Sequence, residues 1–121
     1  MARQTWPSVM QETEGSAHGI ALVLDPENEA RPRFELVARG IRWSRPKGNY
    51  ALRITREAGM TKILAAFVER ADAEAFAAAV GGGSPTREGW ASWWRMDFDE
   101  GRQSALEALA PKPRRAPSRQ R

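Results

Sequence analysis

The chain has 121 residues, a length typical of a single domain that buries a core of its own. It contains no cysteine, which excludes disulfides, thiolate metal sites and cysteine nucleophiles. The net charge is +4, but residues 1–110 carry 14 basic and 15 acidic side chains, so the excess comes from residues 111–121. The beginning of the chain has no apolar run that could act as a signal, and no run reaches the roughly 18 apolar residues of a membrane span. We therefore expect a cytoplasmic protein that does not contact a membrane.

Residues 1–17 show no clear period, and we expect a poorly defined N-terminal segment with a short helix over 9–14. The stretch 19–24 lies between a glycine and an Asp-Pro turn, which predicts a strand that is apolar on both faces. The polar, proline-bracketed residues 25–33 predict a loop.

The most regular pattern lies between Arg33 and Arg56. Apolar and polar side chains alternate over 34–39 and again over 50–55, which is the period of half-buried antiparallel strands. An extra residue at Gly40 would form a β-bulge and keep Trp43 on the apolar side. Proline and a Gly-Asn pair in the connection predict a turn. We therefore expect a two-stranded hairpin whose outward face is cationic.

The later elements follow from turns and composition. A tight turn over 57–60 leads into a further apolar strand over 61–68, and short turns between successive strands favour an antiparallel meander. The alanine-rich stretch 72–80 starts with acidic residues and is followed by glycines, which predicts a helix. A last helix is expected to begin near Asp99 and to end before Pro111.

The stretch 89–99 contains three of the five tryptophans. Trp90, Trp93 and Trp94 have the spacing of a helix, whereas apolar and polar residues alternate over 93–98 as in a strand. The aromatic, β-prone composition favours the strand. The helix is the alternative.

No catalytic, metal or nucleotide motif stands out. His18 is the only histidine, and no nucleophile accompanies it in the sequence, so we do not expect a general base. Asp97, Asp99 and Glu100 form an acidic cluster whose spacing fits no cation-binding loop, and acidic residues are common at a helix N-terminus. The glycine-rich run 81–84 lacks the Lys-Ser/Thr end of a P-loop. We expect no catalytic residue, no metal and no cofactor.

Basic residues are concentrated in the middle of the chain. The stretch 31–56 carries eight of them and a single acid, whereas 12–29 carries five acids and no base. This segregation favours a phosphate-binding surface, although 16 arginines against three lysines also suggest compositional bias. The Pro/Arg-rich tail 111–121 is expected to be disordered and to add affinity that is independent of sequence. The residues predicted to contact nucleic acid are Arg33, Arg39, Arg42, Arg45, Lys47, Arg53, Arg56, Arg114 and Arg115.

Protein interaction is the competing class of function. Trp and Arg dominate the hot spots of protein interfaces, and a strand with an outward Trp93 beside Arg95 would anchor a protein partner or a second copy of the chain. The residues predicted to bind such a partner are Trp90, Trp93 and Arg95.

These patterns predict an α+β fold. We expect a single domain over 18–110 with an antiparallel sheet of about five strands in meander order, two helices packed on one face, and a disordered basic C-terminal tail over 111–121. The expected function is a small binding module without catalysis of its own, an interaction or adaptor domain anchored by a Trp-rich surface. Binding of DNA or RNA is the alternative.

Overall fold

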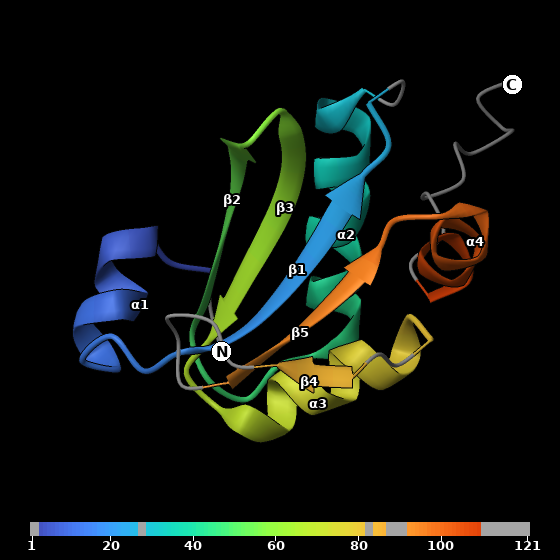
Figure 1. Cartoon of the computed structure of the whole chain (residues 1–121). Coiled ribbons are helices and arrows are strands. Elements are labelled where there is room, and N and C mark those ends of the chain that lie inside the picture. Colours follow the sequence, from blue (N-terminus) through green and yellow to red (C-terminus); the bar gives the residue numbers. More distant parts are fainter. Residues whose placement is uncertain (1–2, 27–28, 82–83, 87–91, 110–121) are drawn as a thin grey trace, which may run out of the picture.

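The structure is a computed structural model of the chain, and it describes residues 3–26, 29–81, 84–86 and 92–109. Within these ranges helices are interspersed with strands along the chain (Figure 1). The helices are α1 (Trp6–Glu12), α2 (Ala30–Ser44), α3 (Arg70–Ala79) and α4 (Glu100–Leu109). The strands are β1 (His18–Leu24), β2 (Tyr50–Glu57), β3 (Met60–Phe67), β4 (Ser84–Thr86) and β5 (Ser92–Asp97).

The strands form one mixed sheet in the order β2-β3-β1-β5-β4, in which β4 is a short strand of three residues. Strand β1 pairs antiparallel with β3 and parallel with β5, and the β2–β3 and β4–β5 pairs are antiparallel. The predicted α+β fold is confirmed, but the predicted antiparallel meander is wrong. The reason is helix α2. It connects β1 to β2 in such a way that the two strands are not neighbours, and β3 then pairs between them.

The predicted hairpin between Arg33 and Arg56 is wrong in its first half. Residues 30–44 form helix α2, and the strand of this region is β2 alone. The loop predicted over 25–33 is correspondingly shorter, because the helix begins at Ala30.

The side chains of α2 explain why this stretch is helical. Phe34, Val37 and Ile41 are spaced by three and four residues, and all three pack on the main core. The helical repeat therefore accounts for the apolar residues on both sides of Gly40 without a bulge. Pro32 lies in the first turn, where proline is tolerated, and the helix ends at Arg45 in a left-handed conformation with φ of 57°.

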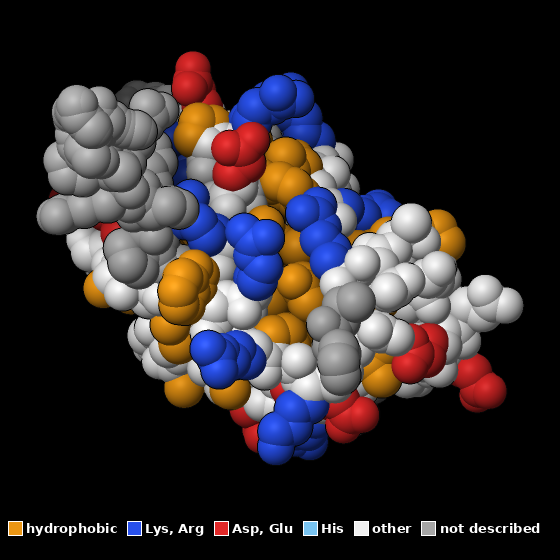
Figure 2. Space-filling model, turned by 180° about the vertical axis from the view of Figure 1, so that it is seen from behind, with side chains coloured by type: hydrophobic (Ala, Val, Ile, Leu, Met, Phe, Trp, Pro, Cys, Tyr) orange, Lys and Arg blue, Asp and Glu red, His pale blue; other side chains and the backbone are white. Residues whose placement is uncertain are grey.

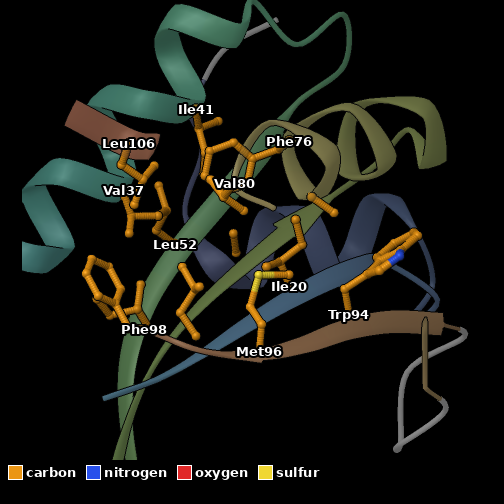
Figure 3. Close-up of a cluster of buried hydrophobic side chains, with 14 of the residues drawn as sticks. Ile20, Val37, Ile41, Leu52, Phe76, Val80, Trp94, Met96, Phe98 and Leu106 are labelled. Atoms are coloured by element: carbon orange, nitrogen blue, oxygen red, sulfur yellow. The ribbon is translucent and has the colours of Figure 1, made fainter. Parts of the chain in front are cut away.

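Helices α2, α3 and α4 cover one face of the sheet, and α2 lies behind the strands in Figure 1. The two predicted helices of this layer, α3 and α4, are therefore joined by a third. Figure 3 shows strand residues such as Ile20 and Met96 pointing into the same cluster as Ile41 and Phe76 from the helices. Phe67 and Phe76 are the largest of the fully buried members of this core.

The opposite face carries helix α1. Val9 of α1 packs with Ala51 and Ala66 in a second, smaller core, and the half-buried Trp6 covers Leu64. The other predicted elements lie close to their expected ranges: strands β1, β3 and β5, the turn between β2 and β3, and helices α3 and α4. The tail 111–121 lies outside the described residues. In the part of the chain that the structure describes, no helix combines the length and the apolar character needed to cross a bilayer.

The connection from α2 to β2 is attached to helix α3 by one buried carboxylate. Asp72, which is 8% exposed, accepts the backbone N–H of Lys47 at 3.0 Å and that of Gly48 at 2.8 Å. A side chain at position 48 would collide with Glu69, since an added Cβ would lie 2.6 Å from its Cγ. Gly48 and Asp72 together fix where β2 begins.

Replacing Asp72 with alanine should therefore destabilise the fold. Two partly buried N–H groups would lose a charged acceptor, at a cost of about 2–3 kcal/mol in the free energy of unfolding. Glu74 on the same helix forms only an exposed ion pair with Arg70 at 3.0 Å, so the control Glu74→Ala should cost less than about 0.5 kcal/mol. Urea denaturation of both variants measures the difference, and equal losses would contradict the role assigned to Asp72.

Candidate functional site

The cationic residues predicted for one hairpin face come from different elements. Their positions correct the prediction, because the first strand of the expected hairpin is the helix α2, so these residues do not share one β-ribbon. Arg33, Arg39 and Arg42 lie on α2, Arg45 and Lys47 lie in the connection, Arg53 and Arg56 lie on β2, and Arg114 and Arg115 lie outside the described residues.

The two arginines of β2 lie on opposite faces of the sheet. The guanidinium of Arg53 lies 4.9 Å from the ring centroid of Trp6, on the side of α1. Arg56 lies three residues further along the strand, so its side chain points to the other face of the sheet. Its Nε donates to the hydroxyl of Thr61 at 3.2 Å. Both side chains are exposed. The charges therefore border β2 on either side and do not form one cationic face.

The tryptophans divide into buried and exposed residues. Trp94 is 5% exposed and belongs to the core, whereas Trp43 is 53% exposed on α2, contrary to the inward position predicted for it. Arg95 is exposed on β5. Trp90 and the side chain of Trp93 lie outside the described residues, so their predicted role in partner binding stays a prediction.

A hollow lies where the parallel strands β1 and β5 end. It has a volume of about 820 Å³, and Asp25, Asp97, Asp99 and Glu100 contribute to its lining. Asp99 caps helix α4, because its carboxylate accepts the backbone N–H of Arg102 at 2.8 Å and also the guanidinium at 3.2 Å. Within the described ranges no three His, Asp or Glu side chains form a group that could hold a metal ion. Of the acidic cluster, Asp99 is thus engaged in capping α4.

The outer edge of β2 is a second candidate. The N–H of Val68 donates to the carbonyl of Asn49 at 3.0 Å, and these two residues face each other in the β2–β3 register. Backbone groups of an antiparallel strand point alternately toward and away from its neighbour. The N–H and C=O groups of Leu52, Ile54 and Arg56 therefore point away from β3, toward the edge of the sheet.

The chain itself covers only the beginning of this edge. Arg3 forms an isolated parallel bridge with Tyr50, and the N–H of Gln4 donates to the carbonyl of Tyr50 at 2.7 Å. The chain then turns away into α1. No described residue bonds to the outward backbone groups of Leu52, Ile54 or Arg56. We call these three residues the β2 edge.

Apolar side chains lie beside the β2 edge. Ile54 is 42% exposed, and half-buried Phe34 packs on the core cluster that also contains Leu52. The guanidinium of Arg3 lies 5.3 Å from the ring centroid of Phe34. Figure 2 views the molecule from the side of α2, where apolar side chains form a strip bordered by Lys and Arg on both sides.

The sequence predicted strand β2 but not its position at the edge. The alternation over 50–55 depends only on local burial, whereas an edge position depends on which strands lie on either side. Strand order here depends on α2, which was predicted as a strand. Nothing in the sequence signals that Ile54 is exposed, because it alternates with polar residues as an inward residue would.

Comparison with protein-family models, with curated proteins and with solved structures found no match to this chain.

If the β2 edge is open, Ile54 should contribute little to stability compared with the residue opposite it. Ile54 faces Ile63 of β3, which is fully buried. Replacing Ile63 with alanine should cost about 2–5 kcal/mol, whereas Ile54→Ala should cost about 1 kcal/mol or less. Chemical denaturation of the two variants, with midpoints and slopes compared, tests this. Similar losses for both would mean that Ile54 is covered.

Proposed function

We propose that this protein is a protein-interaction module that binds an extended segment of a partner at the β2 edge. The observation that carries the proposal is the row of outward backbone groups at Leu52, Ile54 and Arg56, with no partner among the described residues. An extended segment that adds to an open edge gains backbone hydrogen bonds, and side chains on alternate positions provide specificity.

The side of the edge that faces α2 offers apolar contacts to such a segment. Side chains of an added strand would lie next to Ile54 and near Phe34, both of which are only partly covered. Each backbone hydrogen bond contributes about 0.5–1.5 kcal/mol net, and covering the exposed part of Ile54 adds to this. A few residues of pairing would therefore give a weak but specific interaction.

The N-terminal segment supports this mode of binding. Residues Arg3 and Gln4 already pair with Tyr50, which means that the edge of β2 accepts a parallel strand at its first residue. A partner would continue the same row of hydrogen bonds where this segment ends. The proposal takes the β2 edge as the binding surface, whereas the sequence predicted a Trp-rich surface.

A random peptide display library selected against the protein tests the proposal. Peptides that bind at the β2 edge should lose at least about tenfold in affinity for Ile54→Pro, because proline removes the outward N–H. They should also weaken for Ile54→Lys, which keeps the N–H but removes the apolar contact. Fluorescence anisotropy of the selected peptides measures both changes.

The control is Thr55→Ala, because the N–H of Thr55 points toward β3 and its side chain lies on the opposite face. It should leave peptide affinity unchanged. Amide spectra should show the largest shifts at Leu52, Ile54 and Arg56. A library that yields no binder, or binders that are indifferent to both substitutions of Ile54, would refute the proposal.

Nucleic-acid binding is a second candidate, and it is favoured by Trp43. This side chain is 53% exposed and follows the exposed Arg42, with Arg39 one helical turn before it. An exposed tryptophan beside arginines is the arrangement on which single-stranded bases stack, and each stacked base contributes about 1–3 kcal/mol.

If a single strand binds there, Trp43→Ala should weaken binding of oligo-dT by roughly fivefold or more. Arg42→Gln should lower the slope of log affinity against log salt by about 0.7, the value for one phosphate on a single strand. Arg70→Gln on α3 is the control and should change neither quantity. Binding that Trp43→Ala leaves intact, or that disappears when residues 111–121 are removed, would exclude α2 as the nucleic-acid site.

A further inference from the structure

The side chains around the β2 edge carry positive charge. Arg53 and Arg56 are exposed on opposite faces of β2, and the guanidinium of Arg3 lies over Phe34, 5.3 Å from its ring centroid. The one acid of the strand, Glu57, is engaged by Lys62 of β3, with 3.2 Å between Nζ and Oε1. The contacts of Arg53 with Trp6 and of Arg56 with Thr61 involve uncharged groups, so both positive charges are without a counter-ion in these contacts.

An added strand would meet these charges at fixed positions. Its side chains alternate between the two faces of the sheet, as do those of β2. The residue opposite Ile54 lies on the side of α2 next to an apolar side chain. The residue opposite Arg53 lies on the side of α1, and the residue opposite Arg56 lies again on the side of α2. Residues directly across a strand pair are close enough to form ion pairs.

We infer that the partner segment is an acidic extended peptide, with an aliphatic residue opposite Ile54 and carboxylates opposite Arg53 and Arg56. The inference rests on the proposed function, because it specifies the chemistry of the segment bound at the β2 edge. Charge complementarity is the ground for it: the edge offers two cations and an apolar side chain to a bound strand, and no uncommitted acid of β2.

The same charges oppose pairing with a second copy of the chain. An antiparallel β2–β2 pair centred on Ile54 would place Ile54 opposite its counterpart and Arg56 opposite Leu52. The two copies of Arg53 would then lie diagonally across the pair on the side of α1, whereas the copies of Arg56 lie on the side of α2. Like charges gathered on a short pair of strands are destabilising. A partner of opposite charge is therefore favoured over a homodimer at this edge.

Three synthetic peptides with one backbone pattern test the inference on the full chain. Each carries Thr-rich flanks around the sequences Glu-Thr-Ile-Glu, Gln-Thr-Ile-Gln or Lys-Thr-Ile-Lys, and each is also made in reversed order to allow for a parallel orientation. Amide chemical shifts of the labelled protein, followed during titration, give both the position and the affinity of binding.

The Glu peptide should bind about fivefold more tightly than the Gln peptide, because two exposed ion pairs each contribute a modest amount. The Lys peptide should bind more weakly than both. High salt should reduce the preference for Glu. The double variant Arg53→Gln/Arg56→Gln should abolish the preference, whereas Arg70→Gln, which removes an exposed arginine on α3, should leave it unchanged.

The outcomes separate this inference from the proposed function. If Glu and Gln peptides shift the amides of Leu52, Ile54 and Arg56 equally, binding at the β2 edge stands and the acidic partner is refuted. If no peptide shifts these amides, both the acidic partner and the proposed binding at the β2 edge are refuted. If these amides shift with protein concentration while the sedimenting mass doubles, a second copy of the chain binds the β2 edge. If oligo-dT shifts these amides and displaces the Glu peptide, a nucleic acid binds the β2 edge. Either of these last two results overturns the inference.

Discussion

The packing of helix α2 across the sheet is the constraint on which the other features depend. Gly40 lets α4 approach α2 closely, because an added Cβ would lie 2.7 Å from the Leu106 side chain, which is fully buried. At the end of α2, the buried carboxylate of Asp72 holds the backbone of the following connection through two hydrogen bonds. The helix is thereby fixed at both α3 and α4. Helix α2 connects β1 to β2, which forms the outermost strand of the sheet, and β3 pairs between β2 and β1.

An outermost strand has backbone groups without a neighbour, and natural sheets protect such strands by charge, by irregular backbone or by a covering segment. Two of these devices are present on β2. The N-terminal residues cover its first position, and Arg53 and Arg56 charge the remainder. Neither blocks the outward N–H groups. A charged edge that is still able to form hydrogen bonds discourages pairing with its own copy and favours a partner of opposite charge, so protection and selectivity have the same physical source.

The sequence predicted the elements whose signals are local. Strands β1 and β3 are apolar on both faces, and the alanine-rich α3 carries Asp72 in its first turn and is followed by glycines, so each local pattern agrees with the element that forms. The prediction for the stretch containing α2 was wrong because two patterns coexist there. Phe34, Leu36 and Ala38 alternate as in a strand, while Phe34, Val37 and Ile41 repeat as in a helix. A window this short satisfies both periods. The β2 edge could not be predicted, because it depends on strand order, which in turn depends on a helix that was assigned as a strand.

Amide hydrogen exchange along β2 in the free protein tests the open edge most directly. If β2 is bonded on one side only, the amides of Ala51, Arg53 and Thr55, which point toward β3, should exchange slowly, and those of Leu52, Ile54 and Arg56 should exchange fast. An alternation of slow and fast exchange from one residue to the next is the expected result. Uniform protection of both sets would mean that the edge is already paired, and would contradict the binding surface proposed for this protein.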